Sequence, residues 1–155
     1  MRAVLLLPVA FAVLCLAADD DGNAPLLPDG PGKEVVAKVC VECHSVDRMR
    51  SLRISKDEWW EKVADMVDRG AKLTDPETEA VVSYMAQNFG PDSKVWVNTA
   101  PMVELKSVLG FSVAEGNAVV AYRRDHPKFK AWSDLLQVPG MDAGKVEAKK
   151  DLMLF

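Results

Sequence analysis

The chain has 155 residues, of which 49% are hydrophobic, so it has room for one ordinary domain or two small ones and is neither disordered nor fibrous in composition. Its charge is unevenly divided: residues 19–92 contain 9 Lys or Arg and 16 Asp or Glu, whereas residues 93–155 contain 9 against 7. The acidic first part argues against nucleic acid as its partner and favours a positively charged protein surface. The small positive excess of the second part gives little support to tight binding of duplex DNA.

The N-terminus has the pattern of an export signal. Arg2 is followed by an apolar run over residues 3–18 that is too short to span a bilayer as a helix of the mature protein. Cys15 and Ala17 are small residues at the positions that a signal peptidase recognises. We therefore expect residues 1–18 to be a signal peptide and the mature protein to be periplasmic or otherwise exported, with no transmembrane segment.

The alternative for this N-terminus is a lipoprotein anchor, in which Cys15 would be acylated. This alternative is less favoured because Leu14 is bulkier than such a site prefers. Residues 19–31 are mostly Asp, Gly, Asn and Pro, a composition that predicts a flexible acidic tether without chemistry of its own.

Residues 40–44 are Cys-Val-Glu-Cys-His, the spacing typical of covalent haem attachment, because both thiols can add to the haem vinyl groups and the imidazole can bind the iron. A structural zinc site would need four ligands, and no cysteine lies outside this motif once Cys15 has been removed. A thioredoxin-like dithiol would need a βαβ setting, of which the sequence shows no sign. A chance match or an unmodified dithiol is the remaining alternative to one covalently bound haem c.

Three helices are predicted in the part that contains this motif. Valines at helical spacing indicate a helix over residues 32–40, which delivers the motif at its C-terminal end. Capping boxes, in which Ser or Thr is followed three residues later by Glu, open a second helix over 55–70 and a third over 74–89. About 60 residues make a marginal protein core, so the haem must contribute much of the buried apolar surface.

The second part consists of short helices separated by glycine turns, and the helix-turn-helix arrangement occurs twice. The predicted helices cover residues 102–109, 112–124, 132–138 and 143–152. We find no alternation of apolar and polar residues of the kind that indicates a strand. The predicted fold class is therefore all-α, with a cytochrome-sized helical domain followed by a second helical domain.

Residues 32–91 resemble the small class I monohaem cytochromes c, in which an N-terminal helix runs into the attachment motif and a C-terminal helix, here containing Tyr84, packs across it. The resemblance implies that Cys40 and Cys43 hold the haem by thioether bonds. It also implies that His44 is the proximal ligand of the iron.

The distal iron ligand departs from the commonest pattern, which places a methionine on a long loop before the last helix. Residues 70–74 are too short to form such a loop. The region is more similar to a shorter variant, found among haem subunits and domains that accompany periplasmic dehydrogenases, through Trp59, Met66, Gly70 and Leu73.

Met66 is the preferred distal ligand because it lies on the helix that must line the haem, and a thioether sulfur is a suitable soft donor. Met49 and Met85 are the other methionines of this part, and Lys72, His126 or an open position complete the alternatives. Apolar residues at helical spacing are usually core residues, so Met66 also fits plain packing. For His126 a surface loop is the expected place.

Arg53 and Trp59 are candidate haem contacts. An arginine can hold a propionate through two hydrogen bonds, and a tryptophan can border the ring. The alternative for this pair is a packing tryptophan and a solvated arginine.

Residues 95–155 resemble the tandem helix-hairpin-helix domain of ComEA-type competence DNA receptors. The matching stretches are Val97 to Ala100, Glu104-Leu105, Ala121 to Arg123, Lys128 to Lys130, Asp134 to Leu136 and Val138 to Gly140. In that family each hairpin carries Gly-hydrophobic-Gly, whose backbone amides approach a phosphate. Here the second glycine is replaced by Ser112 in one hairpin and by Asp142 in the other, and a carboxylate or a side chain at this place opposes phosphate binding.

Four basic residues of the second part, Arg123, Arg124, Lys128 and Lys130, form a modest cluster that could contact a phosphate or an acidic protein. A solvated face is the more usual role of such a cluster.

The expected function is that of an exported single-electron carrier rather than an enzyme, since the sequence shows no acid-base or nucleophile constellation beside the haem motif. Its partners would be electron donor and acceptor proteins, among them a periplasmic dehydrogenase, with the helix-hairpin-helix part used for docking. The alternative is a DNA-binding or protein-binding helix-hairpin-helix protein in which the haem is secondary. A peroxidase or gas-binding haem would require an open distal position.

Overall fold

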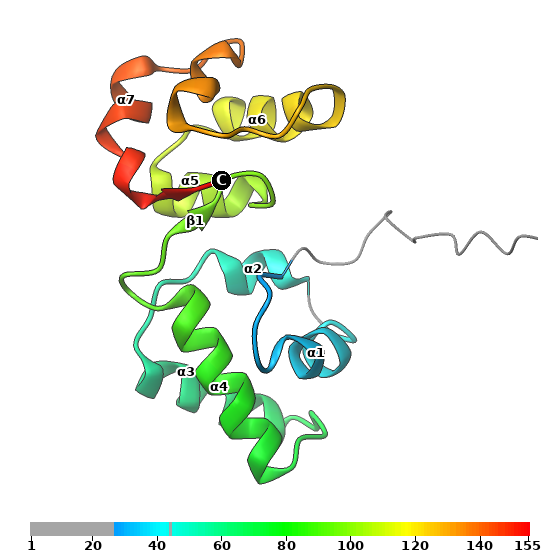
Figure 1. The fold of residues 1–155 in the computed structure, drawn as a ribbon. Coiled ribbons are helices and arrows are strands. Elements are labelled where there is room, and N and C mark those ends of the chain that lie inside the picture. Colours follow the sequence, from blue (N-terminus) through cyan, green and yellow to red (C-terminus); the bar gives the residue numbers. More distant parts are fainter. Residues whose placement is uncertain (1–26, 44) are drawn as a thin grey trace, which may run out of the picture.

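The computed structural model describes residues 27–43 and 45–155. The predicted signal peptide, most of the predicted tether and His44 lie outside the described residues. Two groups of helices, one before and one after residue 91, lie one above the other in Figure 1. Their buried apolar side chains form two separate clusters, so each group of helices surrounds a core of its own.

The first group of helices follows the predicted capping signals. Its elements are α1 (Lys33–Val35), the π-helical turn η1 (Val36–Cys40), α2 (Val46–Arg50), α3 (Lys56–Asp68) and α4 (Asp75–Phe89). At the start of α3, Ser55 Oγ accepts a hydrogen bond from the Glu58 amide, and the Glu58 carboxylate accepts one from the Ser55 amide at 2.8 Å. The same reciprocal cap opens α4. Both predicted capping boxes of this part are confirmed.

The helix before the attachment motif crosses α4 at Gly32. A Cβ atom on Gly32 would lie 2.6 Å from the Ala80 carbonyl oxygen and 2.9 Å from Tyr84 Cβ, and the Gly32 φ angle is +96°. Both the crowding and the backbone angle require glycine here. Tyr84 also donates a hydrogen bond from its hydroxyl to the Pro28 carbonyl at 2.6 Å. The expected packing of the Tyr84 helix across the first helix is confirmed.

Helix α2 lies between the cysteine motif and α3, where the sequence predicts no helix. Ser45 starts α2 by accepting a hydrogen bond from the Asp47 amide at 3.2 Å. Val46 and Arg50 are both buried. A five-residue helix has too few apolar positions to show a periodicity, so its formation depends on what packs around it.

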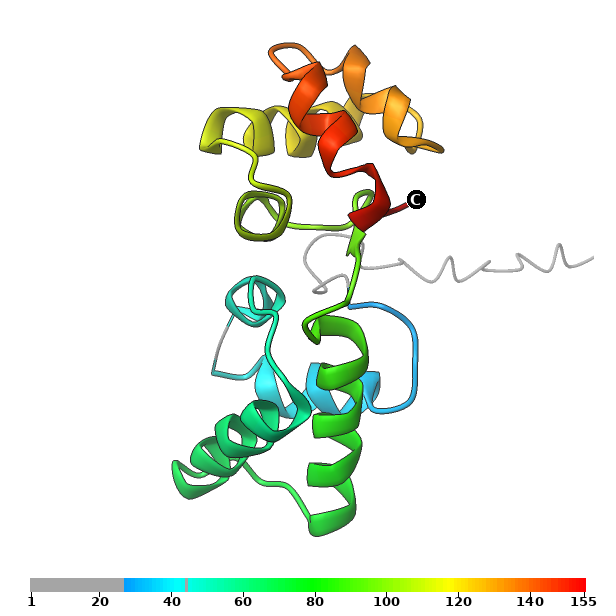
Figure 2. The ribbon, with the colours of Figure 1, turned by 90° about the vertical axis from the view of Figure 1, so that its left-hand side faces the viewer.

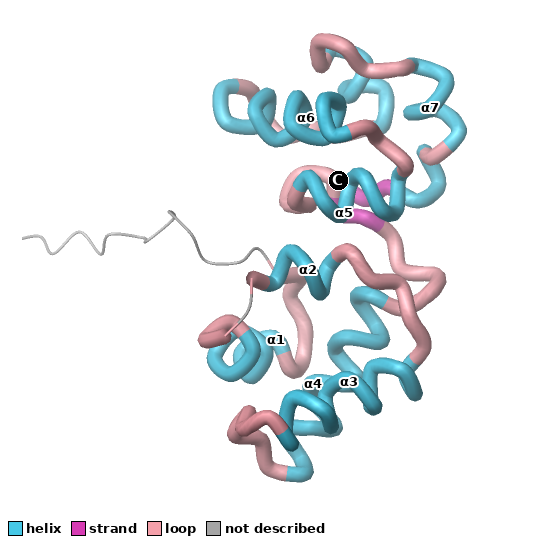
Figure 3. The backbone as a smooth tube through the Cα atoms, turned by 180° about the vertical axis from the view of Figure 1, so that it is seen from behind, coloured by secondary structure: helices cyan, strands magenta, loops and turns pink. Residues whose placement is uncertain are grey.

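The second group contains the helices predicted from its capping and glycine signals. Its elements are β1 (Val95–Trp96), α5 (Met102–Leu109), α6 (Val113–Asp125), the 3₁₀ turn η2 (Trp132–Gln137), α7 (Ala143–Ala148), the 3₁₀ turn η3 (Lys150–Leu152) and β2 (Met153–Leu154). Gly110 ends α5 at φ +72°. The capping box at the start of α6 is also present. Figure 3 shows the same elements from behind.

The all-α prediction missed one short ladder. Strands β1 and β2 pair in parallel, with Val95 opposite Met153 and Trp96 opposite Leu154. The last predicted helix is correspondingly shorter, because it ends at Ala148 and the chain turns into β2. Two residues cannot display an alternating pattern, so this pairing arises only when the two ends of the second part meet.

Within the two described ranges, no helix combines the length and apolar character that crossing a bilayer would require.

Candidate functional site: the cysteine motif and the two hairpins

The two motif cysteines are unbridged and differ in exposure. Cys40 is the last residue of η1 and is half-buried against the first core, whereas Cys43 is exposed. Both are free thiols, and burial raises the pKa of the Cys40 thiol. His44, the predicted proximal ligand, lies outside the described residues. The structure therefore presents two free cysteines close together in the chain, one half-buried and one exposed.

Cys40 lies at the edge of the first core. It is one of a set of partly buried apolar side chains that pack against that core, together with Val35, Ala37, Val41, Met49, Leu52, Ile54, Leu73 and Ala86. An apolar group bonded to Cys40 would therefore lie beside this core and would remove apolar surface from water, which is favourable. This setting and the two unbridged thiols fit a covalently held haem.

The candidate distal ligands are not equivalent in the structure. Met85 is a core residue with 2% exposure, and Met49 packs against the same core. Met66 is half-buried, on α3 one turn after the buried Val63. Lys72 is exposed. Met66 thus remains the methionine of this part that the core uses least.

His126 lies in the second group of helices, directly after α6. Its ring is exposed and its Nδ1 lies 3.0 Å from the Tyr122 carbonyl oxygen. This is the surface position predicted for it.

Arg53 and Trp59, the two candidate haem contacts, have other partners. Trp59 is buried and donates its indole N–H to the Phe89 carbonyl at 3.2 Å. Arg53 donates to the carbonyls of Arg50, Leu52 and Ser93, and its Nη2 lies 2.8 Å from Glu104 Oε1. The structure places Trp59 in the core and Arg53 in the contact between the two groups of helices.

A metal site requires several ligating side chains close together. In the part of the chain that the structure describes, no group of three His, Cys, Asp or Glu side chains has the arrangement of a metal site. The zinc alternative therefore gains no ligand from these residues.

The two hairpins of the second part are joined by Glu115. Its Oε2 accepts hydrogen bonds from the Ser112 amide and from Lys145 Nζ, both at 2.6 Å, and its Oε1 accepts a 3.4 Å hydrogen bond from the Asp142 amide. Ser112 and Asp142 are also the N-caps of α6 and α7, each accepting from an amide three residues later. One carboxylate therefore binds the amide that follows the turn in both hairpins.

Comparison with known proteins identifies this second part. A family model described as the helix-hairpin-helix motif matches residues 91–153. The C-terminal part of the chain is a helix-hairpin-helix domain. An uncharacterized protein of Haemophilus influenzae is 30% identical over 89 residues, which are 54% of this chain and 80% of that protein, so the chain belongs to the same family as that protein. No solved structure matches the chain.

The helix-hairpin-helix domain uses its hairpin amides internally. Hydrogen bonds, first from Lys145 and then from Ser112, lower the pKa of Glu115 to about 2, so the carboxylate is ionised at neutral pH. The carboxylate accepts hydrogen bonds from the Ser112 and Asp142 amides, so these two amides are not available to an external phosphate. The sequence indicated the cap between Ser112 and Glu115 but not the reach of Glu115 to the second hairpin.

The four basic residues of the helix-hairpin-helix domain do not all lie on its surface. Arg123 is turned inward and donates from Nη1 to the carbonyls of Val97 and Ala100 at 2.7 and 2.9 Å. Arg124, Lys128 and Lys130 are exposed. The predicted cluster is therefore reduced to three surface cations, while Arg123 supports the backbone before α5.

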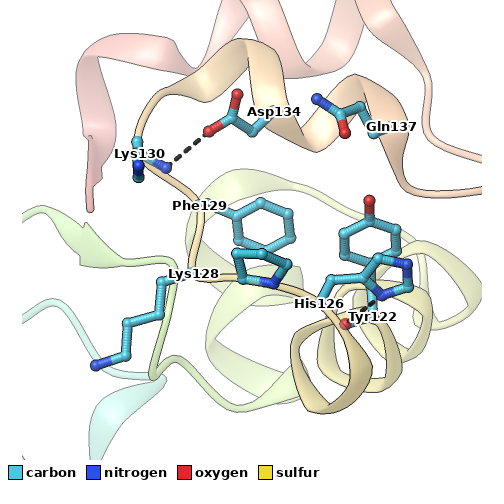
Figure 4. A pocket seen from close by; sticks show the side chains of 8 residues that line it. Tyr122, His126, Lys128, Phe129, Lys130, Asp134 and Gln137 are labelled. Carbon is cyan, nitrogen blue, oxygen red and sulfur yellow. Dashed lines mark hydrogen bonds between the residues drawn. The ribbon is translucent and has the colours of Figure 1, made fainter.

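A small cavity lies beside two of these cations. It has a volume of about 210 Å³, and Figure 4 shows it between the loop that carries Lys128 and the turn that carries Asp134 and Gln137. The Tyr122 and His126 rings stack at its edge with centroids 3.6 Å apart. The Asp134 carboxylate is already engaged with the amide of Lys130 at 2.7 Å.

The joint made by Glu115 predicts a dependence of stability on pH. Because the pKa of Glu115 is lowered from about 4.5 to about 2 in the folded protein, its contribution is fully present above pH 4.5 and is lost as the pH falls towards 2. We expect the free energy of unfolding, measured in urea by tryptophan fluorescence, to fall over this window less steeply in Glu115→Gln than in the wild type. Glu58→Gln removes an exposed capping carboxylate of α3 and is the matched control, with a smaller effect. Equal slopes in Glu115→Gln and the wild type would contradict the assignment.

Proposed function

We propose that this protein is an exported c-type cytochrome that carries single electrons, with its helix-hairpin-helix domain as a docking and supporting module. The observation that carries the proposal is the pair of free thiols, Cys40 and Cys43, at the end of a helix and directly before His44. The crossing of that helix with α4 at Gly32 gives further support, because it is the packing that the resemblance to small cytochromes c implies.

In this proposal the residues of the first part have separate roles. Cys40 and Cys43 would hold the haem by thioether bonds, and His44 and Met66 would bind the iron. The haem would supply one-electron exchange at its iron when bound. Apolar side chains at the edge of the first core, to which Cys40 belongs, would exclude water from the side of the haem that they contact, and a drier site would strengthen the influence of nearby charges on the iron.

The charges of the first part favour a basic partner. Its exposed carboxylates lie on several elements and include Glu42, Asp47, Asp57, Glu61, Asp65, Asp68 and Asp75. Such a surface steers positively charged proteins by long-range attraction, an effect that salt screens. A periplasmic dehydrogenase with a basic docking surface is the electron donor that we propose.

Covalent haem is the decisive test of this function. We expect the exported protein, purified from a host with a haem-attachment system, to gain the mass of one haem and to keep it in acidified organic solvent, because thioether bonds resist extraction. A reversible redox spectrum should accompany it. The double variant Cys40→Ala/Cys43→Ala should lose the covalent mass, whereas extraction of all haem from the wild type would refute the proposal.

Met66 can be tested as the distal ligand by its sulfur. Met66→Leu keeps the apolar volume but removes the thioether, so the ferric iron–sulfur charge-transfer band should disappear and the reduction potential should fall. Met85→Leu makes the same change in the core and should leave the band in place. A band that persists in Met66→Leu and vanishes in Met85→Leu or Met49→Leu would reassign the ligand.

A DNA-binding function is the second candidate, favoured by the helix-hairpin-helix match over residues 91–153 and by the exposed Arg124, Lys128 and Lys130. The occupation of the hairpin amides by Glu115 weighs against it. A carboxylate in this place repels phosphate, and few surface cations give only a weak affinity for DNA.

Gel-shift titrations of duplex DNA with the full-length protein test this candidate. We expect no retardation at low salt, because the amides are occupied. The double variant Lys128→Glu/Lys130→Glu is the control and should behave like the wild type. A salt-sensitive shift that this variant abolishes would establish DNA binding and would make the haem secondary.

A further inference from the structure

We infer that the helix-hairpin-helix domain holds the haem-attachment segment in position through Glu104, which thereby influences the haem site; this inference rests on the proposed function. Helix α2 begins two residues after His44. It packs against α5 of the helix-hairpin-helix domain, and both helices are seen nearly end-on, one above the other, in Figure 2. The two parts of the chain meet at the helix that follows the motif.

A buried carboxylate between two arginines forms the centre of this contact. Glu104 Oε2 lies 2.7 Å from Arg50 Nε, and Glu104 Oε1 lies 2.8 Å from Arg53 Nη2. Glu104 and Arg50 are 1% and 2% exposed. Each oxygen of the Glu104 carboxylate thus accepts a charge-assisted hydrogen bond in a site without solvent, where such bonds are strong.

Further contacts accompany the two ion pairs. Arg50 Nη2 lies 3.4 Å from Thr99 Oγ1, and Ser107 of α5 donates from its hydroxyl to the Ser51 carbonyl at 3.1 Å. Arg53 also lies over the Phe89 ring, 5.7 Å from its centroid. The contact therefore connects the end of α2, the end of α4 and the face of α5, and it cannot open without separating buried charges from one another.

Helix α2 also packs against the first core. Val46 is buried in the first core, and Met49 and Leu52 pack against that core. The segment after His44 is therefore held between the first core and α5. A domain joined only by a flexible tether would leave α2 free to move. Here the helix-hairpin-helix domain instead packs on α2, the helix that follows the proposed proximal ligand.

The charges of the contact give its effect on the haem a sign. Glu104→Gln removes one negative charge, and buried charges are little screened by salt. The more positive surroundings favour the reduced iron, so the midpoint potential should rise. Replacing Arg50, Arg53 and Glu104 by apolar side chains removes two positive charges and one negative charge, so the potential should fall.

The test uses the full-length mature protein and two measurements. Hydrogen exchange by mass spectrometry should show that Glu104→Gln raises the exchange rate of the amides in residues 46–52 at least tenfold, while those of α6 keep their rates. Glu115→Gln is the matched control, because it neutralises a buried carboxylate of the same domain that contacts the hairpins and not α2. It should leave residues 46–52 unchanged.

The second measurement is the midpoint potential of the haem protein. If Glu104 had only a structural role, its variants would not shift this potential in opposite directions. We expect an upward shift in Glu104→Gln and a downward shift in Arg50→Met/Arg53→Met/Glu104→Leu, with no shift in Glu115→Gln. The triple variant also provides a measurement if Glu104→Gln fails to fold, because apolar replacement of a buried ion cluster often preserves the fold.

The outcomes separate this inference from the proposed function. The role of Glu104 would be overturned if Glu104→Gln left the exchange rates of residues 46–52 unchanged, whatever the haem content. It would also be overturned if the midpoint potentials of Glu104→Gln and the triple variant shifted in the same direction. Absence of covalent haem would overturn the function, whereas the exchange measurement would still decide whether Glu104 holds α2.

Discussion

The relation between the two parts of this protein depends on one buried carboxylate. Glu104 bridges Arg50 and Arg53 across the contact between α2 and α5. Taking three charged groups out of water is costly, and their attraction compensates only when the geometry satisfies both carboxylate oxygens, as it does here. The result is a specific relative placement of two cores, since a purely apolar contact would tolerate sliding that this arrangement forbids.

A second buried carboxylate, Glu115, serves the same purpose within the helix-hairpin-helix domain. It holds together the two hairpins and Lys145 through amides that could otherwise bind an external anion. Both carboxylates are satisfied by groups of the same chain, because Glu104 binds arginines at α2 and Glu115 binds the hairpin amides and Lys145. These contacts are consistent with the supporting role that we propose for the domain.

Most helices could be predicted because their signals are local. Reciprocal caps at Ser55, Thr74 and Ser112, together with Gly110 at a positive φ angle, lie within a few residues of the ends that they define. The short elements could not be predicted, because α2 and the pairing of β1 with β2 involve too few residues for a periodicity and are stabilised by distant segments. The helix-hairpin-helix domain was also predictable, because its resemblance depends on short stretches of sequence within residues 95–155.

The sequence by itself determined three features: the mostly helical character, the two-residue spacing between Cys40 and Cys43, and the presence of Ser112 and Asp142 where the resembling hairpins have glycine. Only the tertiary structure decided the partners of the charged side chains. Arg53 pairs with Glu104 and Arg123 with backbone carbonyls before α5, contacts that span 51, 26 and 23 positions of the chain. The sequence shows that a charged side chain is present, but the packing of whole helices decides which group it contacts.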